Sequence, residues 1–216
     1  MKPQISLALL ASLAAASPIN EQRQLGGSTE NGLRGPCKDI AFIFARGSTE
    51  IGNMGTICGP PTADRLRDEF GEDKVAVQGV NYPARLSTNF LPSGGDPDGV
   101  RDMTSHITDT VSKCPETIIV AGGYSQGAAI THETVKSLDS SVIDRIAGIV
   151  TFGDTQNKQD NGRIPNYPPE QTKIICAPGD LVCEGTLIIT PAHLGYTMDA
   201  REAAEHLISM IKAAQA

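Results

Sequence analysis

The chain has 216 residues, of which 39% are hydrophobic and 20% are charged, as expected for one ordinary globular domain. Its formal net charge of -7 argues against binding to nucleic acid or to anionic membranes, because like charges repel. An acidic chain of this kind is compatible with a neutral substrate.

The N-terminal residues have the pattern of a secretory signal peptide. Lys2 supplies the positive charge, residues 5–16 form an apolar run, and residues 14–16 offer an A-x-A cleavage site. The run is shorter than the roughly 20 apolar residues that span a bilayer, and no later segment qualifies. We expect a secreted protein with a signal peptide at residues 1–16, a pro-segment or disordered arm at 17–34, and one domain at 35–216.

From Asp39 onward, short apolar runs alternate with segments of helical periodicity. Strands are expected at 40–44, 75–80, 117–121, 146–152 and 172–176, and helices at 60–70, 100–111, 127–138 and around 207–211. Strands that alternate with helices imply right-handed crossovers. The sequence therefore predicts a three-layer α/β fold, with a five-stranded, mostly parallel sheet covered by helices on both faces.

The pentapeptide Gly123-Tyr-Ser-Gln-Gly127 lies between the third expected strand and the next helix. This is the context of a nucleophile elbow, where a serine occupies a strained strand-to-helix turn and glycines two positions away avoid a clash. The helix N-terminus also directs N–H groups toward developing negative charge. The pattern predicts Ser125 as a catalytic nucleophile.

An elbow serine needs a histidine base and an acid that orients the histidine. His193 lies in an irregular segment after the last strand, whereas the other three histidines fall within expected helices: His106, His132 and His206. For the acid, Asp154 follows the strand after the nucleophile strand, and Asp180 follows the next one. The usual hydrolase topology and the chain order serine, aspartate, histidine favour Asp180 and His193.

The oxyanion of the reaction needs two hydrogen-bond donors. One should be the backbone N–H of Gln126, the residue after the nucleophile, and the other should come from residues 46–49, after the first strand. Ser48 in that loop could also offer its hydroxyl.

The sequence contains five cysteines, so at least one has no partner within the chain, and two bridges could form in fifteen ways. Cys176 and Cys183 could close a small loop around Asp180. The chain has no C-x-x-C pair and no Cys/His cluster at zinc spacing, so we expect no structural metal. The predicted chemistry also needs no cofactor.

Together these motifs resemble the fungal cutinases, small secreted serine esterases that hydrolyse the plant polyester cutin. The resemblance covers nearly the whole chain from Gly35 and is carried by RGSTE at 46–50, GGYSQG at 122–127, GRIPNY at 162–167, GDLVC at 179–183 and HLGY at 193–196. It implies an α/β-hydrolase without a large lid.

The resemblance also implies roles for particular residues. It implies the triad Ser125, Asp180 and His193, and an oxyanion hole from Ser48 and Gln126. It further implies that Asn89 orients the Ser48 hydroxyl, and that the disulfides are Cys37–Cys114 and Cys176–Cys183. Cys58 is then left unpaired, because the strand that pairs with this region in some relatives has no cysteine here.

Apolar residues lie on the two long loops that should face the nucleophile, Leu86, Phe90 and Leu91 on one, and Leu187, Ile188, Ile189 and Leu194 on the other. Such loops would form an open apolar groove. The residues expected to bind the acyl chain are Leu86, Tyr124, Leu187, Ile189 and Leu194.

We therefore expect a monomeric cutinase acting on insoluble polyester and on small acyl esters through an acyl-enzyme intermediate. Two alternatives remain open at this stage. An acetylxylan esterase would share the fold and the elbow, and a secreted, non-catalytic surface-binding protein could use the same scaffold.

Overall fold

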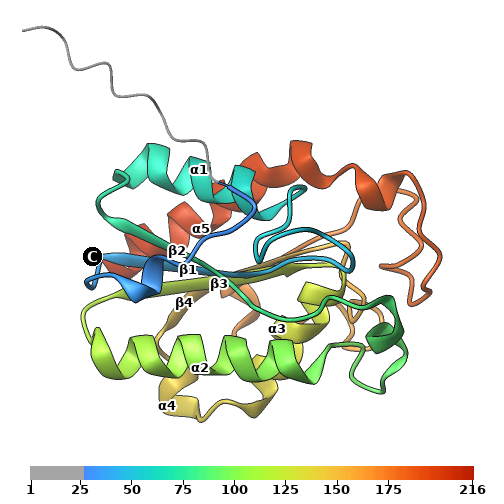
Figure 1. Cartoon of the computed structure of the whole chain (residues 1–216), viewed down its shortest axis with the longest axis horizontal. Helices are drawn as coiled ribbons and strands as arrows, with labels where there is room; N and C mark the ends of the chain where they lie inside the picture. The colour runs from blue at the N-terminus through green and yellow to red at the C-terminus, as the bar shows by residue number, and fades with distance from the viewer. Residues whose placement is uncertain (1–26) are drawn as a thin grey trace, which may run out of the picture.

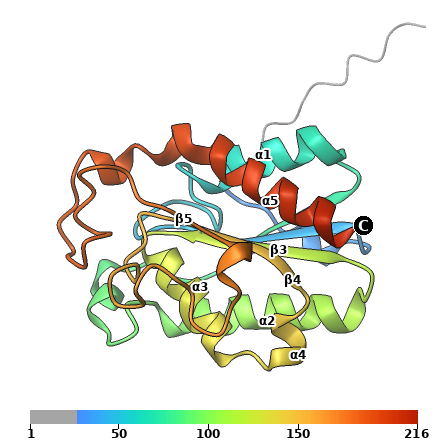
Figure 2. The same ribbon diagram turned by 180° about the vertical axis from the view of Figure 1, so that it is seen from behind.

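The computed structural model describes residues 27–216 (Figures 1 and 2). The expected signal peptide at 1–16, and the part of the expected arm up to residue 26, lie outside the described residues. None of the described helices is both long enough and apolar enough to cross a membrane.

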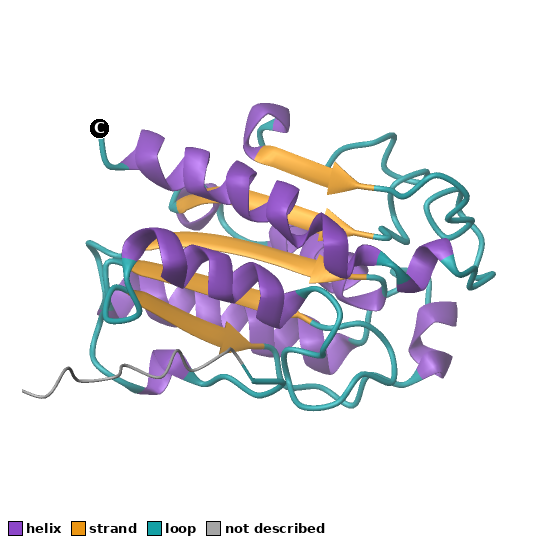
Figure 3. Ribbon diagram, turned by 90° about the horizontal axis from the view of Figure 1, so that it is seen from above, coloured by secondary structure: helices purple, strands orange, loops and turns teal. Residues whose placement is uncertain are grey.

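The centre of the fold is a five-stranded sheet with the strand order β2-β1-β3-β4-β5. The strands are β1 (Ile40–Ala45), β2 (Val75–Gly79), β3 (Ile118–Tyr124), β4 (Ile146–Phe152) and β5 (Thr172–Ile175). All four pairings are parallel, so the carboxyl ends of the strands lie at one edge, where the long loops gather (Figure 3). The expected α/β sheet is thus confirmed, and its edge is where a ligand site is expected in this architecture.

Helices cover both faces of the sheet, which gives the three expected layers (Figures 1 and 2). One layer contains α1 (Gly59–Phe70) and α5 (Ala200–Ala214), which pack against each other. The opposite layer contains α2 (Pro97–Lys113), α3 (Gln126–Ser137) and the short α4 (Ser140–Ile143), which the periodicity did not predict. Short 3-10 turns cover residues 32–34, 86–90, 169–171, 192–194 and 196–199.

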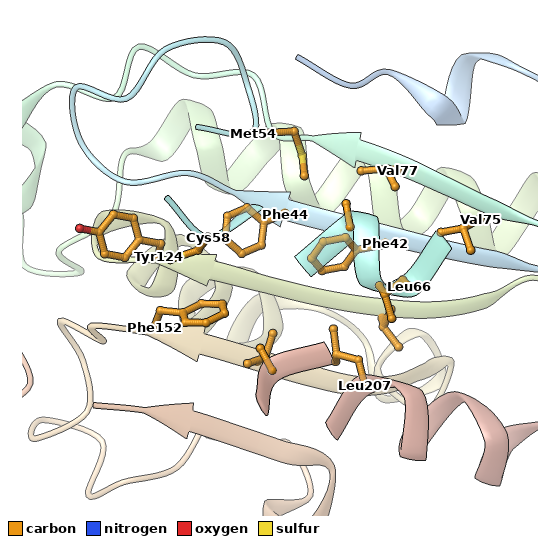
Figure 4. Close-up of a cluster of buried hydrophobic side chains, with 14 of the residues drawn as sticks. Phe42, Phe44, Met54, Cys58, Leu66, Val75, Val77, Tyr124, Phe152 and Leu207 are labelled. Atoms are coloured by element: carbon orange, nitrogen blue, oxygen red, sulfur yellow. The ribbon is translucent and has the colours of Figure 1, made fainter. Parts of the chain in front are cut away.

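Strand β1 illustrates how the sequence builds two cores. Its side chains alternate between the faces, because successive residues of a strand point in opposite directions. Phe42 and Phe44 join the core under α1 and α5, together with Leu66 and Leu207 (Figure 4). Ala41 and Ile43 join the second core, with Met103 and Ile130 among others. Every residue of β1 is buried, which explains why the strand is an unbroken apolar run rather than an alternating one.

The described part of the expected N-terminal arm is packed against the domain rather than disordered. Glu30 forms a bidentate ion pair with Arg67 of α1, with distances of 2.9 and 3.0 Å. Its backbone N–H donates to the side chain of Asn53 at 2.9 Å, and Asn31 forms an isolated bridge with Gln78. Polar composition suggested an arm, but Ser28, Glu30 and Asn31 are held by specific hydrogen bonds that composition does not reveal.

Two disulfides are present in the structure, Cys37–Cys114 and Cys176–Cys183. The first joins the segment before β1 to the end of α2, and the second closes a loop after β5. Cys58 is unpaired and fully buried in the core under α1. Burial raises the pKa of its thiol well above the usual value, so this cysteine behaves as a small apolar residue.

Candidate active site

Ser125 lies at the turn between β3 and α3, with φ of 56° and ψ of -117°. This backbone conformation is strained for a residue other than glycine. A Cβ added to Gly123 would lie 2.1 Å from the carbonyl oxygen of Gly127, and one added to Gly127 would lie 2.0 Å from that of Ala45. Both glycines of the pentapeptide are therefore required by the close packing of the turn.

Three residues from separate loops form a continuous hydrogen-bonded chain. His193 Nε2 is 2.9 Å from Ser125 Oγ, and His193 Nδ1 is 2.9 Å from Asp180 Oδ2. Asp180 and His193 are each 2% exposed, and Ser125 is 8% exposed. Because an ionised carboxylate only accepts, Nδ1 carries a proton and Nε2 can accept one from Ser125. This arrangement can activate a serine for nucleophilic attack.

The carboxylate of Asp180 is held by several donors besides the histidine. The Tyr196 hydroxyl donates to Asp180 Oδ2 at 2.6 Å, and the backbone N–H of Val182 donates to Oδ1 at 3.0 Å. Burial raises the pKa of Tyr196 far above its usual value, so the phenol stays protonated and remains a donor. The loop that carries Asp180 is also closed by the Cys176–Cys183 bridge.

The Tyr124 side chain contacts both the backbone and the ring of His193. Its hydroxyl donates to the backbone carbonyl of His193 at 2.7 Å, and the centroids of the two rings are 5.2 Å apart. Tyr124 is 3% exposed, although part of it lines the cavity at Ser125. In addition to the expected contact with substrate, Tyr124 thus fixes the backbone of the segment that carries the histidine.

The RGSTE segment forms an ordered loop beside Ser125. Glu50 accepts hydrogen bonds from the backbone N–H groups of Gly47 at 2.8 Å, Thr56 at 2.8 Å and Ile57 at 3.0 Å. Buried Arg46 donates to the carbonyl oxygens of Glu50 and Tyr82, both at 2.7 Å. The two charged residues of the motif therefore organise the backbone of the loop.

Ser48 in this loop faces the cavity at Ser125 and contacts Asn89. The Asn89 amide Nδ2 donates to Ser48 Oγ at 2.9 Å. Gln126 follows Ser125 at the start of α3, and its side chain donates to Arg85 O at 2.9 Å and to Thr88 Oγ1 at 2.8 Å. The side chain of Gln126 thus connects the elbow to the loop that carries Asn89, while its backbone N–H lies in the first turn of α3.

An apolar cavity of about 360 Å³ opens beside Ser125 and His193. It brings together all five residues that the sequence suggested for acyl binding: Leu86, Tyr124, Leu187, Ile189 and Leu194. The four aliphatic ones are at least 42% exposed. Thr155 and Val182, which the sequence did not suggest, also line the cavity.

Asp154, the alternative candidate for the acid, contacts a different histidine. Asp154 Oδ2 is 2.9 Å from His132 Nε2, and both side chains are fully buried. No hydrogen bond connects this pair with Ser125 Oγ among the described residues. The same described residues contain no group of three His, Cys, Asp or Glu side chains able to hold a metal ion.

Sequence reasoning missed two positioning residues of the site. Tyr196 belongs to the HLGY segment, but a tyrosine shortly after a histidine gives no sign that its hydroxyl contacts an aspartate 16 positions earlier. Gly153 packs so closely on His193 that an added Cβ would lie 2.7 Å from Cε1 of the ring. The sequence places Gly153 at the end of an expected strand, but its contact with His193 depends on how the loop folds.

Comparison with known proteins identifies clear relatives. The Cutinase family model matches residues 36–211. The chain is 48% identical to a protein of Aspergillus niger named "Probable cutinase 1", over 98% of this chain and 86% of that protein. It is similar to the structure of Trichoderma reesei cutinase in complex with a phosphonate inhibitor, with 34% identity, a TM-score of 0.76, and coverage of 86% of this chain and 80% of that one.

An acetyl xylan esterase structure has the same fold. It matches with 19% identity and a TM-score of 0.60, and the match covers 82% of this chain and 100% of that chain. At this identity the likeness concerns the arrangement of the sheet and helices and not the substrate.

Proposed function

The chain belongs to the cutinase family and is a carboxylic ester hydrolase, and we propose that its catalytic triad is Ser125, His193 and Asp180. The observation that carries this assignment is the continuous hydrogen-bonded chain from Asp180 Oδ2 through His193 to Ser125 Oγ, with both contacts at 2.9 Å. The substrates we propose are the ester bonds of cutin and of short- to medium-chain acyl esters.

The first half of the reaction forms an acyl-enzyme. Ser125 Oγ bonds to the carbonyl carbon of the ester, and His193 Nε2 takes the hydroxyl proton. The tetrahedral intermediate then collapses, and the alcohol leaves with the proton from His193. Asp180 stays ionised throughout and stabilises the imidazolium that forms.

The second half of the reaction restores the enzyme. His193 takes a proton from water as the water oxygen bonds to the acyl carbon. Collapse of this intermediate releases the carboxylic acid, and the proton on His193 returns to Ser125 Oγ.

The oxyanion is stabilised, in this proposal, by the backbone N–H of Gln126 and the hydroxyl of Ser48. The contact between Asn89 Nδ2 and Ser48 Oγ supports this role. Because Ser48 Oγ accepts from the amide, its own proton is left to donate toward the cavity. Donors fixed before the reaction stabilise developing charge without reorganising, which makes them effective.

The apolar cavity is the proposed site of the acyl chain. Its aliphatic lining residues are exposed on two loops that flank Ser125, so an ester at the surface of an insoluble polymer could reach the serine. A small polar acetyl group on a polysaccharide would not use this surface, which favours cutin over acetylated xylan.

The proposed setting is extracellular, with the protein acting as a monomer. Two disulfides support secretion, because such bonds persist in oxidising compartments.

The deciding experiment is hydrolysis of p-nitrophenyl butyrate by Ser125→Ala. Loss of a triad serine should lower kcat by about 10⁴- to 10⁶-fold while the far-UV circular dichroism stays that of the parent protein. An organophosphate should label the parent protein at residue 125 and should not label the variant. Undiminished turnover by the folded variant would show that another residue is the nucleophile.

The substrate class needs its own comparison. The unmodified enzyme should hydrolyse butyrate esters and cutin faster than acetylated xylan at matched enzyme concentration. The reverse preference would refute the proposed substrate while leaving the triad in place. A protein that binds cutin but neither turns over any ester nor reacts with an organophosphate would be a non-catalytic binding protein.

A further inference from the structure

A second histidine lies on the nucleophile helix and is enclosed by carboxylates. His132 of α3 is fully buried. Its Nε2 is 2.9 Å from Asp154 Oδ2, and its Nδ1 is 2.7 Å from Asp160 Oδ2. An ionised carboxylate only accepts hydrogen bonds, so both ring nitrogens must donate. His132 is therefore an imidazolium cation between two anions, and it cannot act as a base.

The surrounding groups stabilise this charged state. Asp154 Oδ2 also accepts from Thr151 Oγ1 at 2.7 Å, and Asp154 Oδ1 accepts from the backbone N–H of Gln156 at 2.8 Å. Burial by itself would lower the pKa of His132, but Asp154 and Asp160 outweigh burial and raise that pKa to about 9. Burial likewise opposes ionisation of Asp154, yet His132 brings the pKa of Asp154 below its usual value.

One further cation reaches the cluster from α3. Lys136 Nζ is 3.2 Å from Asp160 Oδ2 and 3.0 Å from Glu133 Oε1. The charged groups that face His132 are thus Asp154 and Asp160 directly, and Lys136 with Glu133 at the outer side. The two directly bound carboxylates outnumber the single outer lysine, which favours a positive charge on His132.

The end of β4 and the turn that carries Asp154 contact the backbone of Ser125 and the ring of His193. The carbonyl of Phe152 accepts a hydrogen bond from the backbone N–H of Ser125 at 2.9 Å. A Cβ at Gly153 would lie 2.7 and 2.8 Å from ring atoms of His193, so this turn packs directly on the ring. His132 lies seven residues after Ser125, two turns along the same side of α3. The cluster therefore joins the helix that begins at the nucleophile to the turn against which the base packs.

We propose that His132, bound between Asp154 and Asp160, is a positioning residue that holds α3 and the turn at 153–156 at the separation required for the contact between Ser125 and His193. This inference rests on the proposed triad. A neutral side chain at position 132 would leave a buried carboxylate without its cation, and the turn would shift to let water reach it. The ring of His193 would then lose the surface that orients it.

The cluster has a predictable pH dependence. The pKa of His132 is higher in the folded protein, at about 9, than the usual 6.5. Its contribution to stability is therefore complete below about pH 6.5 and is lost as the pH rises through about 9. The melting temperature of the parent protein should fall over this interval.

The test compares His132→Gln with His106→Gln. His106 is a matched control, because it also lies on a helix and pairs with an aspartate, Asp102, at 3.0 Å, but it lines a separate groove with Lys113 and Cys114. We expect His132→Gln to lower kcat for p-nitrophenyl butyrate by about tenfold to a hundredfold, the usual cost of misplacing catalytic groups. KM should change less than kcat, because Thr155 is the one residue of the turn at 153–156 that lines the acyl cavity. His106→Gln should retain the parent kcat.

A second readout tests whether the charge on His132 contributes to stability. The alkaline fall in melting temperature should be absent in His132→Gln and present in His106→Gln. Kinetics measured well below the melting temperature of each variant decide the catalytic part. A folded His132→Gln protein with the parent kcat would overturn the proposal, even if its melting temperature were lower.

The double variant His132→Leu/Asp154→Asn covers the case in which His132→Gln does not fold. It removes the cation together with its fully buried anion, which proteins tolerate better than removal of one partner. The same drop in kcat supports positioning, and the parent kcat contradicts it. If His132→Gln kept the parent kcat, only the positioning role would be wrong. If Ser125→Ala kept its activity, the proposed triad itself would be wrong, so the two failures are distinguishable.

Discussion

The part of the chain that the structure describes contains two buried His–Asp pairs with the same contact distance and opposite chemistry. His193 Nδ1 and Asp180 Oδ2 are 2.9 Å apart, and so are His132 Nε2 and Asp154 Oδ2. The two pairs differ at the other ring nitrogen of the histidine. In His193 this nitrogen faces a hydroxyl group, and in His132 it faces another carboxylate. A hydroxyl leaves that nitrogen able to accept a proton, whereas a carboxylate requires it to carry one. A histidine beside an aspartate is therefore a candidate base only if its other nitrogen can accept.

The two pairs also differ in how far they are enclosed by the protein. His193 and Asp180 lie on loops after the strands, and the 2% exposed histidine borders an open cavity. His132 lies within α3, and Asp154 follows β4 directly, with both side chains fully enclosed. The first pair can exchange protons with substrate and water. The second pair is enclosed away from the substrate, and its histidine keeps a positive charge until the pH rises through about 9.

The largest expected effect comes from exchanging the acid of each pair for its amide. Asp180→Asn should reduce kcat by about 10⁴-fold, because an amide favours the wrong tautomer of His193. Asp154→Asn should reduce kcat far less, by about tenfold to a hundredfold through misplacement. Steady-state kinetics on p-nitrophenyl butyrate measure both.

The same two variants should rank in the reverse order for stability. Asp154→Asn removes one partner of a fully buried ion pair, which costs about 3–5 kcal/mol of unfolding free energy. Urea unfolding near pH 7 measures this loss. If Asp154→Asn were the variant with the 10⁴-fold loss of kcat, the assignment of the acid would be wrong.

Much of this contrast could be predicted from the sequence. Chain order and the position of strand ends were enough to choose Asp180 and His193, because the carboxyl ends of parallel strands meet at one edge. The apolar runs also predicted all five strands, of which β1 to β4 are almost entirely buried and β5, at the edge of the sheet, is only partly buried. What the sequence could not reveal is that Asp154 and Asp160 enclose His132, because that contact depends on how the loop at 153–162 folds back onto α3.

The described part of the N-terminal arm illustrates the same limit. Its polar residues carry no periodicity, so composition alone suggested a pro-segment or disordered arm over residues 17–34. The bidentate contact between Glu30 and Arg67, and the contacts of Glu30 with Asn53, depend on residues more than 20 positions apart. Long-range polar contacts of this kind leave no local pattern in a single sequence.

An intermediate effect is expected from opening the loop that carries Asp180. The double variant Cys176→Ala/Cys183→Ala should lower the free energy of unfolding by about 2.5 kcal/mol, the chain entropy of so short a loop. It should also lower kcat, because the loop no longer restrains Asp180. The matched variant Cys37→Ala/Cys114→Ala should cost more stability, about 4.5 kcal/mol, and should spare kcat. If both double variants lowered kcat equally under conditions where each is folded, the short bridge would have no special role at the site.

The smallest expected effect is that of Lys136→Met, at the outer side of the His132 cluster. The lysine side chain is 30% exposed, so its ion pairs with Asp160 and Glu133 should contribute no more than about 1 kcal/mol to unfolding free energy. Removing a neighbouring cation should also raise the pKa of His132 further, because one repulsive charge disappears. The alkaline fall in melting temperature should therefore move to higher pH in Lys136→Met than in the parent protein. A shift to lower pH, or a loss of 3 kcal/mol or more, would mean that Lys136 and not His132 is the central cation of the cluster.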